Sequence, residues 1–119
     1  MSRQRFAGIE YCGSGPTPTA QNSMTTAGAV SLATYSTAVN TTTGSGHAST
    51  LANGTRVGQL KKITLVVDAG DLVVTVASLE GGTTITFADA GDAILLQWNG
   101  VKWVPLEYAG AVDAGPAIA

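Results

Sequence analysis

The sequence has one cysteine, one histidine and few charged side chains, and these shortages exclude several classes of protein. Charged residues make up 12% of the 119 residues, against about 25% in an average soluble domain. The net charge of −2 gives no electrostatic indication of nucleic-acid binding, and the adjacent Lys61 and Lys62 would point to opposite faces of a strand. Cys12 alone excludes an internal disulfide or a zinc site built on several cysteines. No apolar run is long enough to span a bilayer, so neither a nucleic acid nor a membrane is expected as a partner.

Side chains able to carry out chemistry are equally scarce. His47 stands in a stretch rich in Gly, Ser and Thr, where we expect a solvated polar residue. No nucleophile signature such as Gly-x-Ser-x-Gly surrounds a serine or Cys12. Two of the eight acids could still face each other as a glycosidase pair, although most of them fall at turns. We therefore predict that the protein is not an enzyme and needs no cofactor.

The residues that replace the missing charges are mainly Thr, Ser, Ala, Gly and Val, a mixture that favours strands and turns. Alternating apolar residues predict strands over 59–67, 72–78 and 83–87, after a weaker strand signal in 27–43. Turn signals about 10 residues apart are typical of antiparallel sandwiches and small barrels. We predict an all-β fold, either an antiparallel β-sandwich or a small β-barrel of jelly-roll type.

The clearest local signal is a hairpin within residues 91–107, centred on Asn99-Gly100. This dipeptide favours a two-residue type I′ turn, which would pair Trp98 with Val101 and Leu96 with Trp103. Both tryptophans then share one apolar face, which favours a core position over an exposed platform for stacking on a sugar. The predicted core residues are Ile63, Leu65, Ile85, Phe87, Ile94, Leu96, Trp98 and Trp103.

A short repeat separates the predicted strands. Val67-Asp-Ala-Gly-Asp71 recurs as Ala88-Asp-Ala-Gly-Asp92, with a partial copy at 112–115. Turn chemistry explains the repeat, because the first Asp of each copy can accept hydrogen bonds from nearby backbone amides and Gly accepts a positive φ. The alternative is a calcium site built from the four aspartates, although the loops lack the ligand spacing of known calcium motifs.

The chain is predicted to consist of an extended N-terminal arm over 1–26 and a β domain over 27–119, with an extended tail from about residue 109. The arm ends in a stretch rich in Gly, Pro, Ser and Thr, and this composition does not bury enough apolar surface to fold alone. A terminus without a role is the plain alternative to a docking arm. No apolar signal segment opens the chain, so synthesis in a cytoplasm is expected. The side chains that could anchor the arm are Arg3, Arg5, Phe6, Ile9 and Tyr11.

The series of segments from about 55 to 107 resembles small β-rich virion proteins of tailed bacteriophages. The matching segments are the Gly-Gln-x-Lys strand within 57–67, the Gly-Gly-Thr-Thr-Ile-Thr-Phe strand at 81–87, and the closing Trp-x-Gly-x-x-Trp hairpin within 91–104. These motifs mark structure rather than chemistry. Residues 1–54 carry no matching motif.

The resemblance implies a capsid decoration (cement) protein, which binds the outside of the phage head as a homotrimer and stabilises it. It implies the major capsid protein as partner, the virion surface as location, and contacts made by Arg3, Arg5, Phe6, Ile9 and Tyr11. Such arms can add a strand to an exposed sheet edge of a neighbour. A fibre, spike or receptor-binding module that contacts host glycans through a loop such as 41–50 is the alternative.

Overall fold

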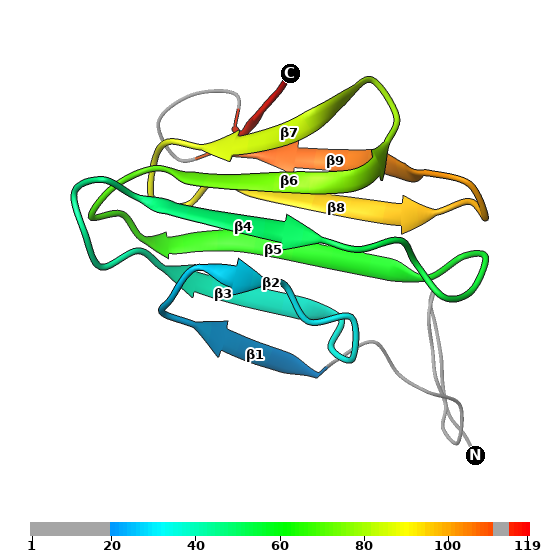
Figure 1. Ribbon diagram of the computed structural model, residues 1–119, viewed down its shortest axis with the longest axis horizontal. Helices are drawn as coiled ribbons and strands as arrows, with labels where there is room; N and C mark the ends of the chain where they lie inside the picture. Colours follow the sequence, from blue (N-terminus) through cyan, green and yellow to red (C-terminus); the bar gives the residue numbers. More distant parts are fainter. Residues whose placement is uncertain (1–19, 111–114) are drawn as a thin grey trace, which may run out of the picture.

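A computed structural model describes residues 20–110 and 115–119. Every regular element in this part of the chain is a β-strand, which confirms the all-β prediction (Figure 1). The three strands predicted most clearly appear as β5, β6 and β7, with bounds within one residue of those expected. The strands are β1 (Gln21–Met24), β2 (Gly28–Ala29), β3 (Ser36–Asn40), β4 (His47–Leu51), β5 (Leu60–Val67), β6 (Leu72–Leu79), β7 (Gly82–Phe87), β8 (Ala93–Trp98), β9 (Trp103–Ala109) and β10 (Ala117–Ile118).

The first six strands are stacked as in a solenoid. The chain crosses from one layer to the other after each strand, so β1, β3 and β5 pair in parallel in one layer while β2, β4 and β6 pair in parallel in the other (Figure 1). We refer to each successive pair, such as β1 with β2, as a turn of the stack. Parallel neighbours need a crossover connection, and here a strand of the opposite layer supplies it.

The last strands add antiparallel hairpins to this stack. β7 pairs with β6, β8 pairs with β5, and β9 pairs with β8, all antiparallel. The two layers are joined where Leu79 of β6 pairs with Trp103 of β9, and β10 pairs with β7. The predicted antiparallel sandwich or small jelly-roll barrel is therefore corrected to a stack of parallel turns. Alternation with a period of two is common to parallel and antiparallel strands, so it could not reveal the difference.

The core lies between the two layers, where the inward side chains of both meet. All eight residues predicted for it are buried, with exposed fractions of 0–6%. The two tryptophans contact edge to face, with ring centroids 5.5 Å apart. Trp103 also donates a hydrogen bond from Nε1 to the carbonyl oxygen of Ala52, at 2.8 Å. The indole N–H is thus satisfied inside the core, which favours this site for a tryptophan.

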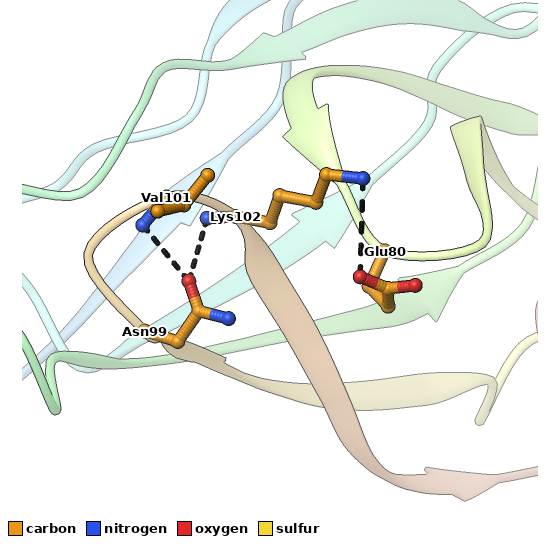
Figure 2. A network of polar contacts seen from close by, with 4 residues as sticks. All are labelled: Glu80, Asn99, Val101 and Lys102. Atoms are coloured by element: carbon orange, nitrogen blue, oxygen red, sulfur yellow. Dashed lines mark hydrogen bonds and ion pairs between the residues drawn. The ribbon is translucent and has the colours of Figure 1, made fainter.

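The hairpin between β8 and β9 differs from the predicted one by two residues. Trp98 pairs with Trp103, so the loop holds residues 99–102 rather than two residues. Asn99 Oδ1 accepts hydrogen bonds from the amides of Val101 and Lys102, at 2.8 and 2.7 Å, and so holds the wider loop (Figure 2). An even shift preserves the faces of a strand, so both tryptophans stay inside. Val101, however, is 69% exposed, and its predicted place on the apolar face is wrong.

The repeated Asp-Ala-Gly-Asp segments form the turns between β5 and β6 and between β7 and β8. In the second copy the last aspartate binds the backbone: Asp92 Oδ2 accepts hydrogen bonds from the amides of Ala88 and Asp89. In the first copy, the side chain of Thr41, which lies between β3 and β4, accepts hydrogen bonds from the amides of Ala69 and Gly70. These contacts cap backbone amides at both turns. The acceptors are Asp92 and Thr41, whereas the prediction gave this role to the first aspartate of each copy.

Candidate interaction surface

His47 lies in β4 and is only 9% exposed, so the prediction of a solvated loop residue was wrong. Its Nε2 atom is 3.3 Å from Thr42 Oγ1. Ser49 follows two residues later on the same inward face, and its hydroxyl makes no hydrogen bond with a described residue. Parallel pairing of β4 with β6 turns this face into the core, which a local reading of the Gly, Ser and Thr residues around His47 could not reveal.

The aspartates of the two repeats do not form a metal site within 20–110 and 115–119. No group of three or more His, Cys, Asp or Glu side chains in this part of the chain is placed to hold a metal ion. Asp92 is 1% exposed, and one of its carboxylate oxygens is used by the turn itself. The described geometry therefore favours the turn explanation over the calcium alternative.

A buried polar network links the first three strands of one layer. Lys61 on β5 is 1% exposed, and its Nζ donates to Thr37 Oγ1 at 2.7 Å and to the Oγ1 and carbonyl oxygen of Thr34, each at 3.0 Å. Both threonine hydroxyls donate to Asn22 Oδ1 on β1, each at 2.7 Å. Removal from water lowers the pKa of Lys61 from 10.5 to about 8, because burial disfavours the charged form.

Lys62 points the other way, as the alternation of strand residues predicts, and it lies beside a hollow on the outer surface of β5, β8 and β9. The hollow has a volume of about 490 Å³, within the usual range for binding sites. The register of the three strands places Lys62, Leu95 and Glu107 side by side. The lining residues are Tyr35, Lys62, Ala93, Ile94, Leu95, Leu106, Glu107, Tyr108 and Ala109.

A β-bulge shapes one wall of the hollow. Leu95 pairs with Glu107 and Leu96 pairs with Pro105, so Leu106 is an extra residue without a partner on β8. Bulges re-aim side chains and are frequent at functional surfaces. Leu106 and Tyr108 remain 47% and 48% exposed, which is a large exposure for mainly apolar side chains. The hollow is therefore the strongest candidate for an interaction surface among the described residues.

No motif in the sequence indicated this surface directly. Lys62 was considered only as one of two adjacent lysines, and Ile94 only as a core residue. The bulge that groups the lining residues depends on pairing between β8 and β9. The one available signal was the apolar residue Leu95 on the outward side of its strand. The predicted capsid-binding residues Arg3, Arg5, Phe6, Ile9 and Tyr11, and also Cys12, lie outside the described residues.

Comparisons with known proteins identify no relative. No protein-family model, no curated protein and no solved structure matches this chain. The described residues contain no helix that is long and apolar enough to cross a membrane. The resemblance to phage virion proteins therefore rests on the motifs quoted from the sequence and stays a prediction.

Proposed function

We propose that this chain is a structural virion protein of a tailed bacteriophage. It binds the outside of the head as a homotrimer, contacts the major capsid protein and stabilises the shell. The observation that carries the proposal is the outer surface of β5, β8 and β9, where a hollow and large exposed apolar side chains offer a surface for protein contact. The motifs of residues 55–107 that resemble virion proteins support it independently.

The mechanism is mechanical. A stack of paired strands is stiff, and repeated small interfaces between such modules and capsid subunits add up over many copies. Linking three capsid contacts in one trimer raises the overall affinity without any single strong contact. We assign the capsid contact to the N-terminal residues Arg3, Arg5, Phe6, Ile9 and Tyr11. Their two cations and three apolar side chains suit a surface with carboxylates and shallow apolar pockets.

Binding to capsids tests the proposal directly. Heads that lack this protein are mixed with the full chain, with a variant lacking residues 2–19, and with a variant in which Gly and Ser replace residues 2–19 at equal length. We expect only the full chain to pellet with the heads. The Gly/Ser variant separates the side chains of the segment from its length. Equal binding by all three variants would contradict the assignment of the contact to this segment.

The copy number per particle tests the decoration function as a whole. Quantitative mass spectrometry of purified virions compares this chain with the major capsid protein. We expect copy numbers of the same order, as for decoration of the whole shell. A few copies per particle would favour the fibre or receptor-binding alternative, and absence from virions would contradict both.

A further inference from the structure

The outer surface of β5, β8 and β9 carries one cation and one anion in its hollow. Lys62 on β5 and Glu107 on β9 both pair with Leu95 of β8, which lies between them. Neighbouring strands are about 4.8 Å apart, so the two backbones are separated by roughly 10 Å. No hydrogen bond or ion pair joins either side chain to another described residue. Each charge is therefore available to a partner.

The rest of this surface is mainly apolar. Leu106 is 47% exposed at the bulge and lines the hollow. Leu95 and Tyr35 are partly exposed beside it. Contiguous exposed apolar side chains with a few charges around them are characteristic of protein interfaces. A partner for this surface needs an apolar centre, an acidic group opposite Lys62 and a basic group opposite Glu107.

A second copy of the chain meets these requirements, and we propose that this surface is the contact between copies. Lys62 of one copy pairs with Glu107 of the next, and the β5 half of each surface packs on the β9 half of its neighbour. The two charges lie on opposite sides of Leu95. This head-to-tail arrangement can therefore close into a ring in which Leu95 of every copy faces the symmetry axis. The three-fold form of the ring rests on the proposed function, whereas the contact itself does not.

Charge reversal tests the contact through the molecular mass in solution, measured by analytical ultracentrifugation over a range of concentrations. We expect the wild-type chain to form trimers, and K62E and E107K each to weaken self-association by about tenfold or more, because like charges then face each other. The double variant K62E/E107K restores opposite charges at every contact and should restore trimers. As a matched control, K102E reverses an exposed lysine of the β8–β9 loop and should leave the mass unchanged.

Mixing the two single variants identifies the symmetry. A two-fold dimer can form from one K62E copy and one E107K copy, and the charges at positions 62 and 107 are then opposite at both contacts. A ring of three from the same mixture always contains two neighbouring copies of the same variant, whose facing charges are alike. We therefore expect no trimers in the mixture. A wild-type chain that stays monomeric, or single variants that associate as strongly as the wild type, would overturn the proposed contact.

The same variants separate this inference from the proposed function. Trimers that do not pellet with phage heads would contradict capsid decoration and leave the contact standing. Wild-type chain that pellets with heads but is monomeric in solution, with K62E pelleting equally well, would contradict the contact and leave decoration standing.

Discussion

The first turn of the stack and the tryptophan hairpin of β8 and β9 are both built from paired strands, but different interactions stabilise them. In the hairpin, Trp98 and Trp103 fill the space between the layers with apolar surface. In the first turn, both residues of β2 are exposed, and the inward residue Asn22 of β1 is held by hydrogen bonds to Thr34 and Thr37. Directional bonds thus add to the apolar contacts of Met24 and Val30 where the stack ends.

The two regions should therefore be sensitive to different changes. The stability that an apolar contact provides falls with the volume of side chain removed. The stability that a buried polar network provides depends on the charge state of its central group. The hairpin should therefore respond to truncation, and the network around Lys61 should respond to pH.

Truncation of Trp103 should have the largest effect. Trp103→Ala leaves a cavity, removes the edge contact with Trp98 and leaves the Ala52 carbonyl without its hydrogen bond. We expect a loss of about 3–5 kcal/mol in the free energy of unfolding, measured by urea denaturation. Asn22→Ala in the first turn is the comparison and should cost about 1–2 kcal/mol. Equal losses for the two variants would contradict the distinction between the two regions.

The pH dependence of stability should identify the network around Lys61. The pKa of Lys61 in the folded chain is about 8, below its ordinary value of 10.5, so between these pH values the unfolded chain holds a proton that the folded chain has released. Stability should therefore rise with pH across this window, by about 3 kcal/mol in total. Lys61→Met should flatten the curve between pH 7.5 and 10, while Lys62→Met should keep the rise.

Substitution of Gly54 should have an intermediate effect on the hairpin. A Cβ atom at this position would meet the side chain of Trp98, including its Cβ at 2.7 Å, and the buried indole has little room to move. We expect Gly54→Ala to cost about 1–3 kcal/mol by thermal denaturation. Gly44→Ala is the control, because the nearest atom to its new Cβ is the Ala69 carbonyl oxygen at 4.0 Å. A Gly54→Ala variant as stable as the Gly44→Ala control would show that Trp98 can move away.

The smallest effect is expected at the exposed ion pair beside the hairpin loop. Lys102 Nζ lies 3.9 Å from Glu80 Oε1, and both side chains are about half exposed (Figure 2). Lys102→Met should change the free energy of unfolding by less than about 0.5 kcal/mol. Asn99→Ala, which removes the two hydrogen bonds that hold the loop, should cost about 1 kcal/mol. A larger loss in the free energy of unfolding for Lys102→Met than for Asn99→Ala would contradict the expected order of the two effects.

Several features of the fold could be predicted because they depend on neighbours in the sequence. The apolar alternation of β5, β7 and β8 indicated which side chains are buried, and Ile63, Phe87 and Trp98 are all found in the core. The hairpin register could not be predicted, because the hydrogen bonds of the Asn99 side chain select the wider loop. The burial of His47 and Lys61 depends on strands that are far away in sequence, as the pairs His47↔Leu72 and Lys61↔Leu96 illustrate.

The sequence by itself determined that the chain forms strands, where most of its turns fall, and which face of each strand is apolar. These properties follow from φ/ψ preferences and from a side-chain period of two, both of which act within a few residues. Only the tertiary structure decided that strands stack in parallel turns, that Lys61 lies in a polar network, and that Lys62, Leu95 and Glu107 share one outer hollow. Strand pairing brings these residues together from distant parts of the sequence, and its free energy comes from contacts that exist only once the layers have formed.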